Sequence, residues 1–412
     1  MSLYKKLILT GFMAFSLFAS NGGVVFAENI FTNEDFLPNK LRRQLEKKGI
    51  SFEAVYTAEY FANTQGGIKR DDTYLTNLDI TLEIDTKKLG LWENGQFFLY
   101  SLHNSGGEKL TGEIVGDLQT VSNIEAPRTS RIYELWYQHS FLDEQLSVLL
   151  GFHDYNSEFN VTEYGGLYIN SSFGIQPDIS AGARPSVFPL AAPGIRIKAL
   201  LDEQWELLFA VYDGDPGDPD VSEHFPRSDL DSSSGVFIAA EAAYHFHKES
   251  LPGFIKLGLW NNTGDFDDVV DLNPSGDPIQ RNNNIGGYVI IDKQFYEESE
   301  GQGLGGFIQF GMNDKRVNEV NMYVGGGFNY KGLIPGRDDD EAGVAVAHAM
   351  INEDIVDAGG RDDYETTIEV TYNIQINDRL RIQPDIQYII NPGAVSAVKD
   401  ALIAGVRVEV SL

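Results

Sequence analysis

The chain ends in Leu402-Ile-Ala-Gly-Val-Arg-Val-Glu-Val-Ser-Leu412, a stretch in which apolar and polar residues alternate. The valines at 406, 408 and 410 are interleaved with Arg407, Glu409 and Ser411. Successive side chains of a β-strand point to opposite faces, so this stretch predicts a strand with one apolar and one polar face. A shift of one residue would expose every apolar side chain, and the pattern therefore also determines the register.

The same alternation continues upstream of this strand. Residues 364–376 and 380–390 form two more period-two segments, joined by the two-residue turn Asn377-Asp378. In the second segment, Arg381 and its alternate neighbours are polar while the intervening residues are apolar. Long antiparallel hairpins of this kind are typical both of soluble β-sandwiches and of membrane barrels.

The N-terminus separates these two classes. Lys5 and Lys6 precede an apolar run over residues 7–19, and Val25-Phe26-Ala27 places small residues where a signal peptidase reads them. This pattern predicts a secretory signal peptide over residues 1–27. No later stretch has the roughly 20 consecutive apolar residues that a spanning helix needs, so a membrane location would require strands.

The composition supports one acidic, exported β domain. Without the leader, the chain keeps 29 of its 31 basic residues and all 61 acidic residues, a net charge of −32. Such a charge repels polyphosphates, and we expect no nucleic-acid partner. The chain has no cysteine, which excludes disulfides and thiolate metal sites, and its 42 glycines, 25 Phe and 19 Tyr fit an all-β architecture.

Counting strands tests the barrel hypothesis. Period-two alternation marks seventeen segments after residue 50, whereas bacterial single-chain barrels have an even number, with short periplasmic turns and longer outer loops. Counting back from the C-terminus places the long connections 155–193, 213–234 and 263–284 on the outer side, but the chain then starts on the periplasmic side only if residues 112–123 belong to a loop. We therefore predict an all-β fold, a transmembrane antiparallel β-barrel of about sixteen strands over residues 50–412, wide enough for an aqueous channel.

A set of sequence blocks carries a family resemblance. The central block is Arg131-Ile-Tyr-Glu-Leu-Trp-Tyr-Gln-His139, followed by Leu149-Leu-Gly-Phe-His-Asp-Tyr-Asn-Ser-Glu-Phe159. Further blocks are residues 170–174, 185–189, 192–196, 211–215, 383–393 and 405–407, preceded by a short amphipathic helix over residues 37–50. In this order the blocks resemble the carbohydrate-selective porins of the OprB type over nearly the whole mature chain.

The resemblance implies an outer-membrane porin of a Gram-negative bacterium through which mono- or oligosaccharides diffuse passively. Its partners would be outer-membrane lipid, lipopolysaccharide and sugars, and a homotrimer is one expected assembly. Residues 28–49 would form an N-terminal periplasmic segment with a short helix. The proline-containing connection 155–193 is our candidate for a constriction loop folded into the barrel, with an external cap as the alternative.

The face opposite the lipid supplies the candidate channel lining. Apolar parity turns Tyr133 and Leu135 toward lipid, so that Glu134 and Trp136 face inward. Rows of opposite charges would give hydroxyl-bearing solutes hydrogen-bond partners, and an inward aromatic ring would pack against a sugar ring. The complete set, with Arg184 from the candidate constriction loop, is Glu134, Trp136, Gln138, His153, Arg184, Arg196, Lys198, Glu206, Glu241, Asp385, Gln387, Arg407 and Glu409.

Simpler interpretations stand beside these assignments. Each charged residue could pair with a neighbour and only stiffen the wall, Trp136 could belong to an interfacial aromatic girdle, and His153 could be an ordinary polar wall residue. The acidic residues 213–220 and 337–340 suit calcium in composition but lack the spacing of a known calcium loop. A solvated acidic loop is therefore preferred for both, and we expect no metal or cofactor.

Two other functions remain open. The charge of −32 would favour a general or cation-preferring porin if the acidic residues line the lumen, and a secreted all-β surface binding protein would carry the same leader and alternation. Catalysis finds no support, because the sequence contains no Gly-x-Ser-x-Gly, no His-Glu-x-x-His and no phosphate-binding glycine loop. We therefore expect a channel and not an enzyme.

Overall fold

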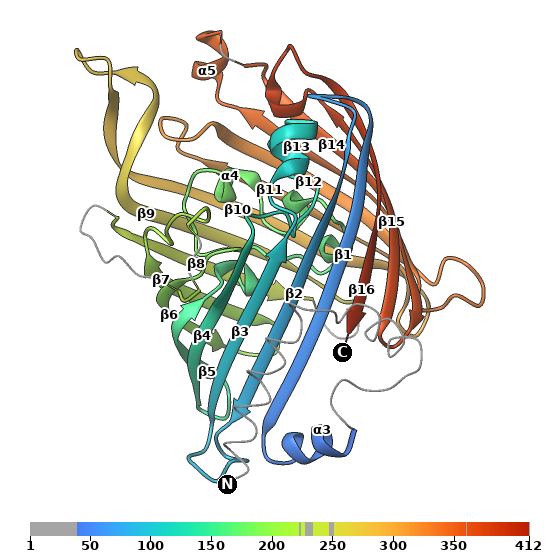
Figure 1. Ribbon diagram of the computed structural model, residues 1–412. Helices are drawn as coiled ribbons and strands as arrows, with labels where there is room; N and C mark the ends of the chain where they lie inside the picture. Colours follow the sequence, from blue (N-terminus) through green and yellow to red (C-terminus); the bar gives the residue numbers. More distant parts are fainter. Residues whose placement is uncertain (1–38, 222–223, 227–233, 247–250, 360, 412) are drawn as a thin grey trace.

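Sixteen antiparallel strands close into a barrel in which the last strand pairs with the first (Figure 1). The computed structural model describes residues 39–221, 224–226, 234–246, 251–359 and 361–411. The predicted signal peptide, residues 1–27, lies outside this part of the chain. Both the β-barrel fold and the number of strands agree with the prediction from the sequence.

The strands follow one another around the barrel in chain order, each pairing with its sequence neighbours. They are β1 (Ile50–Gly67), β2 (Asp72–Asp85), β3 (Gly95–Ser105), β4 (Thr129–Phe141), β5 (Leu146–His153), β6 (Ala192–Leu200), β7 (Trp205–Asp213), β8 (Val236–His245), β9 (Gly253–Leu272), β10 (Pro278–Ser299), β11 (Gln302–Asn313), β12 (Val320–Lys331), β13 (Glu341–Ile351), β14 (Tyr364–Asn377), β15 (Leu380–Ile390) and β16 (Lys399–Ser411).

The C-terminal alternation closes the barrel as a register-matched pair. In the β1–β16 ladder, Val408 lies opposite Ala58 and Arg407 lies opposite Glu59. Apolar residues of the two strands therefore pair on the outer face, and the oppositely charged Arg407 and Glu59 pair on the inner face. Closure removes the unpaired strand edges that an open sheet would present.

The outer face of the barrel is apolar. Leu150, Leu257, Leu259 and Ile308 are between 56 and 61% exposed in the isolated chain. At roughly 25 cal/mol per Å² of apolar surface, leaving such a belt in water is unfavourable, whereas hydrocarbon accommodates it. Trp92, Phe97 and Tyr137 cluster at the end with the short turns, where the Trp92 indole donates to the Tyr137 hydroxyl at 2.7 Å, as in an interfacial girdle.

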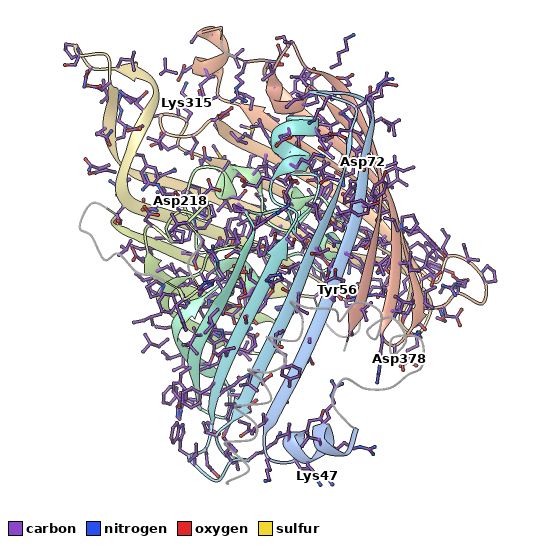
Figure 2. The ribbon with its side chains drawn as sticks, viewed as in Figure 1. Lys47, Tyr56, Asp72, Asp218, Lys315 and Asp378 are labelled. Atoms are coloured by element: carbon purple, nitrogen blue, oxygen red, sulfur yellow. The ribbon has the colours of Figure 1, made fainter. Side chains whose placement is uncertain are left out.

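Both ends of the barrel carry polar residues, and the connections at one end are longer than those at the other. Figure 2 shows Asp72, Asp218 and Lys315 at the end with the longer loops, which we call the loop end, and Lys47 and Asp378 at the turn end. The short helix α3 (Asn39–Glu46) lies at the turn end. It ends four residues before the predicted end at Ile50, and residues 37 and 38 of the predicted helix lie outside the described residues. No helix among the described residues is long and apolar enough to cross a bilayer.

Of two loops predicted from the sequence, the structure confirms one and contradicts the other. Residues 112–123 form no strand, and the π-helical turn Leu110–Val115 occupies the start of this region, so its assignment to a loop is confirmed. The long loop predicted over residues 263–284 is wrong, because β9 and β10 continue as a hairpin beyond the rest of the wall (Figure 1). Polar cross-strand pairs extend this hairpin, including Arg281 with Asp268 at 2.8 Å, and apolar alternation does not detect such pairs.

The largest apolar clusters of the described residues lie inside the barrel, between its wall and two inserted loops. Tyr155, Phe159 and Ile179 from the loop after β5 pack against Phe237 and Trp260 of the wall. On the opposite side, Ile114 and Val121 from the loop after β3 pack against Phe61, Ile389 and Ile403. The alternation predicts a polar inner face, and this prediction is wrong where the loops pack on the wall, because the inner side chains of the strands are apolar there.

Candidate functional site: the inserted loops and the channel lining

The connection between β5 and β6 folds into the barrel and crosses its interior (Figure 1). It contains three single 3₁₀ turns, Tyr155–Ser157, Tyr164–Leu167 and Ser171–Phe173, and the short helix α4 (Pro177–Ser180). Along its course it contacts the wall from β8 round to β15. This placement favours the constriction loop proposed from its length and its prolines over an external cap.

A backbone that runs through the lumen without secondary structure needs acceptors for its N–H groups, and the wall supplies carboxylates. Glu369 on β14 accepts from the backbone amides of Ile169 and Asn170 at 2.7 and 3.0 Å. Asp292 on β10 accepts from the amides of residues 163 and 164 at 2.9 and 3.0 Å. A buried amide left without an acceptor costs about 1–3 kcal/mol, so these contacts hold the loop firmly.

Two further carboxylates of the wall, Glu134 and Glu241, also accept hydrogen bonds from backbone amides of the first inserted loop. Glu134 on β4 accepts from the Asp154 amide at 3.0 Å. Glu241 on β8 accepts from the Asn160 amide at 2.9 Å and from the Tyr288 hydroxyl at 2.6 Å. We call Glu134, Glu241, Asp292, Glu365 and Glu369 the wall carboxylates.

The fifth wall carboxylate, Glu365 on β14, binds the second inserted loop, between β3 and β4. It accepts from the backbone amides of Leu118 and Gln119, both at 2.8 Å. The two loops also bind each other, since the Asn170 side chain donates to the Gln119 carbonyl at 2.6 Å and the Asn123 amide donates to the Ile169 carbonyl at 2.9 Å. Two loops therefore fold into the barrel and bind its wall, and the sequence analysis identified only one of them.

Inward-facing glycines on the far wall make room for the aromatic residues of the loop. A Cβ at Gly305 would come within 2.0 Å of the Tyr164 ring, and one at Gly343 within 2.6 Å of Leu167 and 2.8 Å of the Tyr168 hydroxyl. The Tyr168 hydroxyl also donates to the Asn329 side chain at 2.8 Å. Any larger residue at these two positions would displace the loop from the wall.

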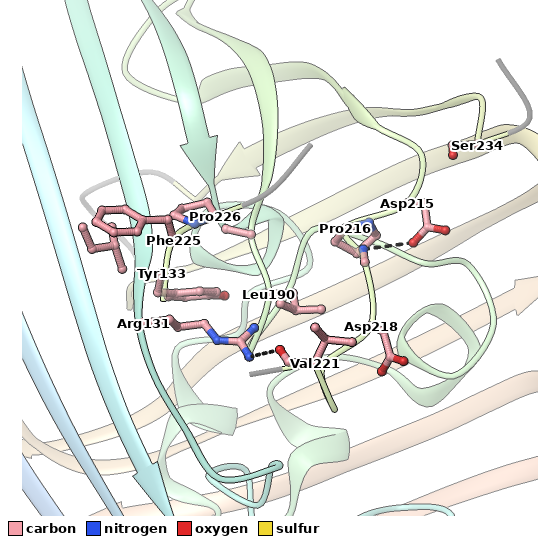
Figure 3. Close-up of a pocket in the computed structure, with 13 residues that line it drawn as sticks. Arg131, Tyr133, Leu190, Asp215, Pro216, Asp218, Val221, Phe225, Pro226 and Ser234 are labelled. Carbon is pink, nitrogen blue, oxygen red and sulfur yellow. Dashed lines mark hydrogen bonds between the residues drawn. The ribbon is translucent and has the colours of Figure 1, made fainter. Parts of the chain in front are cut away.

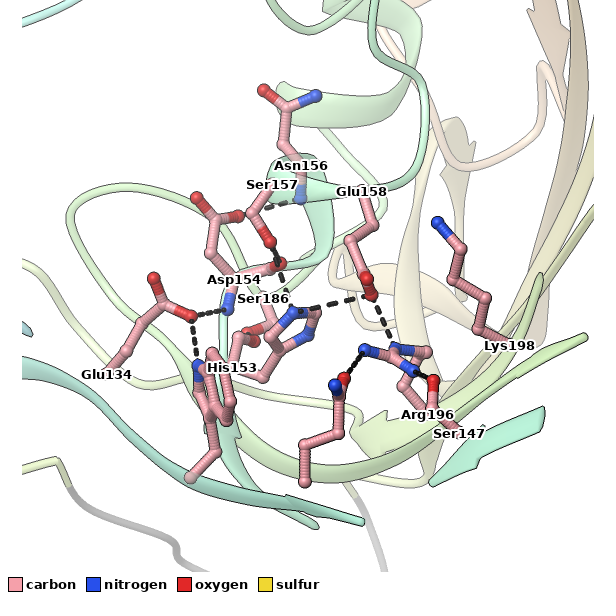
Figure 4. A network of polar contacts seen from close by, with 12 residues as sticks. Glu134, Ser147, His153, Asp154, Asn156, Ser157, Glu158, Ser186, Arg196 and Lys198 are labelled. Atoms are coloured by element: carbon pink, nitrogen blue, oxygen red, sulfur yellow. Dashed lines mark hydrogen bonds and ion pairs between the residues drawn. The ribbon is translucent and has the colours of Figure 1, made fainter. Parts of the chain in front are cut away.

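Arg196 is the centre of a polar network at the foot of the first inserted loop (Figure 4). Its guanidinium pairs with Glu158 of the loop at 2.5 Å and donates to the Ser147 hydroxyl at 2.7 Å and the Gln138 side chain at 2.5 Å. The Arg196 side chain is only 3% exposed. Arg196 therefore fastens the loop to β4–β6 and does not present a free charge to the lumen.

His153 belongs to the same network. Its Nδ1 lies 2.8 Å from the Tyr212 hydroxyl, and its Nε2 lies 3.1 Å from the Ser157 hydroxyl and 3.6 Å from the Glu158 carboxylate. Both ring nitrogens thus have partners inside the protein, and the residue is buried. The polar wall interpretation describes this histidine better than direct contact with a solute.

Trp136 faces inward and not into the interfacial girdle. Its ring stacks on Phe98 with centroids 4.7 Å apart, and its indole N–H donates to Glu134 at 3.2 Å. The predicted outward orientation of neighbouring Tyr133 is wrong. A bulge between Ile132 and Glu134 shifts the register, so that Tyr133 packs in the interior against Tyr100.

Charged pairs that keep contact with solvent remain on both sides of the lumen. On one side, Lys198 pairs with Glu206 at 3.0 Å, and these side chains are 32 and 20% exposed. On the other side, Arg381 pairs with Glu409, with 44 and 19% of their side chains exposed. These are the predicted lining positions that a solute can reach, together with Arg381, which the alternation marked as polar but which was not singled out.

The remaining predicted lining residues lie apart from these pairs. Arg407 binds Glu59 at 2.5 Å and is mostly covered. Asp385, Gln387 and Glu241 face inward but are buried beneath the inserted loops, because both loops pack directly on these strands. Contact between these three side chains and a passing solute is therefore not expected.

Arg184 does not lie with the other lining residues. Its guanidinium sits over the Phe266 ring at 4.1 Å and donates to the Asp265 carbonyl at 2.6 Å, at the base of the β9–β10 hairpin. It ties the end of the inserted loop to the loop end of the barrel. The structure therefore places Arg184 at the loop end, apart from the other predicted lining residues.

Comparisons with known proteins agree with this architecture. Residues 69–412 match the family model described as carbohydrate-selective porin, OprB family. The chain belongs to this family. Porin B of Pseudomonas aeruginosa is 26% identical over 406 residues, covering 89% of this chain and 88% of that protein. The putative porin QuiX of Acinetobacter baylyi is 24% identical over 407 residues, covering 90 and 91%.

A solved structure of an OprB protein has a similar fold. The high-pH structure of OprB from Pseudomonas putida has a TM-score of 0.80 and 23% sequence identity, covering 90% of this chain and 96% of that one. At this identity the likeness concerns the fold. Membership of the OprB family places the chain in the outer membrane as a barrel channel.

The wall carboxylates predict a defined effect on the channel. We expect Glu369→Ala to remove the acceptor of two loop amides and to loosen the first inserted loop, since each buried amide left without an acceptor costs about 1–3 kcal/mol. The variant should show a larger and noisier single-channel conductance in planar bilayers. Asp378→Ala, which removes an exposed charge from the turn between β14 and β15 at the turn end, is the matched control, and equal conductance in both variants would contradict the role of Glu369.

The second inserted loop predicts a pH dependence. Burial raises the pKa of the Glu125 carboxyl to about 8, and this side chain accepts from the Thr111 amide and hydroxyl at 3.0 Å. Because the folded state binds the proton more tightly, its stability falls as the pH rises from about 4.5 to about 8. Open-channel noise should therefore increase over this range and level off above it.

The control for this pH dependence is Glu125→Gln, which keeps the shape and cannot ionise. We expect its noise to change much less over the same range. Noise that rises equally in both proteins would assign the effect to other groups.

Proposed function

We propose that this protein is a passive outer-membrane porin for neutral carbohydrates, mono- or oligosaccharides, without energy coupling, cofactor or catalytic step. Family membership supports the substrate class. The observation that carries the proposal is the pairing of opposite charges at accessible positions of the lumen. Lys198 faces Glu206 and Arg381 faces Glu409, so each of these two cations has an anion beside it.

Such paired charges favour uncharged polyols over ions. A sugar hydroxyl both donates and accepts, so it can exchange hydrogen bonds with either member of a pair, whereas an ion is attracted by one member and repelled by the other. The contacts are partly solvated and therefore weak, which passage requires, because a tightly held solute does not leave.

The acidic composition does not by itself favour a cation channel. Five inward-facing acids, the wall carboxylates, accept backbone hydrogen bonds from the inserted loops, and all five are nearly fully buried, at 5% exposure or less. Of the remaining charge, Asp215, Asp218 and Asp220 lie in the loop after β7, at the loop end. The general or cation-preferring porin is thus the second choice.

The experiment is single-channel recording in planar bilayers with D-glucose or maltose added. We expect sugar to reduce the ion current in a concentration-dependent manner, with half-saturation in the millimolar range or weaker. A reversal potential under a salt gradient should show little preference between cations and anions. A current that ignores both sugars and strongly prefers cations would overturn the proposal in favour of the second choice.

The assembly and the surroundings are also proposals. We propose that the apolar belt contacts outer-membrane lipid and lipopolysaccharide, that residues 28–49 lie in the periplasm, and that three copies associate. Native mass spectrometry from detergent would show one, two or three copies directly.

A further inference from the structure

A pocket of about 200 Å³ opens at the loop end, apart from the charged pairs of the lumen (Figure 3). It exists because β5 is short. Pairing of β4 with β5 stops at Leu135, which leaves the upper part of β4 without a strand neighbour on that side. The loop after β7 folds back into this gap, where the Ile132 amide donates to the His224 carbonyl at 2.9 Å.

The pocket has a rigid polar base. Arg131 is 5% exposed, and its guanidinium donates to the carbonyls of Pro189 and Pro219, both at 3.4 Å, and to that of Val221 at 3.5 Å. These contacts join β4, the end of the first inserted loop and the acidic loop after β7. Arg131 thus shapes the pocket and holds its walls together.

One wall of the pocket is apolar and aromatic. Phe225 is 69% exposed at its rim, with Tyr133, Leu190 and Val221 further in. An exposed aromatic ring over a small cavity offers a flat apolar face to a ring-shaped ligand. The volume lies below the roughly 300–1,000 Å³ typical of sites for drug-sized ligands, so it suits a single small ring.

The opposite wall carries two carboxylates whose orientation the loop itself fixes. Asp215 accepts from the Gly217 amide at 3.0 Å, and Asp218 accepts from the Asp220 amide at 2.9 Å, each through Oδ1. None of the described residues donates a hydrogen bond to Oδ2 of Asp218. An oriented acceptor that faces solvent is ready for a ligand hydroxyl.

We propose that this pocket binds one ring of a neutral sugar, with Phe225 against the ring face and Asp218 accepting from its hydroxyls. The inference rests on the proposed function and adds a binding site at the loop end, before the constriction. The two carboxylates disfavour phosphorylated or acidic sugars. Asp215 also lies 3.9 Å from Arg184 of the first inserted loop, which connects the pocket to the entrance of the lumen.

The test compares Phe225→Ala and Asp218→Asn with Phe141→Ala, which removes an exposed aromatic ring at the turn end. D-glucose is added to either side of a bilayer that contains oriented channels. In the first two variants, the half-saturation concentration for glucose added at the loop end should rise roughly two- to tenfold, as expected for losing an aromatic contact or one hydrogen bond. Block from the turn end, and all values for Phe141→Ala, should stay unchanged.

A second measurement separates this inference from the proposed function. Saturation-transfer NMR with D-glucose on the detergent-solubilised protein reports binding without passage, and we expect its signal to fall in Phe225→Ala. If wild type is blocked by glucose but both pocket variants match it in block and in NMR signal, the pocket proposal is overturned and the porin proposal stands. If wild type shows neither block nor NMR signal, both are overturned.

Discussion

The structure depends on one constraint, which is that polypeptide inside the lumen must find partners for its backbone amides. The two inserted loops have little regular secondary structure, and their own turns satisfy only part of their N–H groups. The wall carboxylates accept eight more of these amides, at distances of 2.7 to 3.0 Å. Since an unpaired buried amide costs about 1–3 kcal/mol, these acids determine where the loops can lie.

This use of charge changes how the interior conducts. The wall carboxylates are covered by the loops that they bind. Arg196 is likewise buried, and its charge is paired with Glu158 of the first inserted loop. The accessible positions include two matched pairs, Lys198 with Glu206 and Arg381 with Glu409. A strongly acidic chain can therefore still present paired charges to neutral solutes in its passage.

Much of the fold could be predicted from the sequence, because period-two alternation is a direct consequence of one face in lipid and the other in water. The prediction failed where that cause is absent. The β9–β10 hairpin beyond the membrane has no lipid face, the bulge at Tyr133 reverses parity locally, and upper wall positions such as Phe61 and Ile403 are apolar because a loop covers them. The inserted loops depend on contacts between residues far apart in the chain, such as Glu369 with Ile169, for which local patterns carry no signal.

Amide hydrogen exchange, read residue by residue in detergent or nanodiscs, tests the central claim most directly. The account predicts that the amides of residues 163, 164, 169 and 170, which lie in irregular backbone, exchange as slowly as those of the neighbouring strands, because wall carboxylates bind them inside the barrel. Exchange at the fast rate of an exposed loop, such as residues 216–219, would mean that the loop lies outside the lumen and would contradict the account.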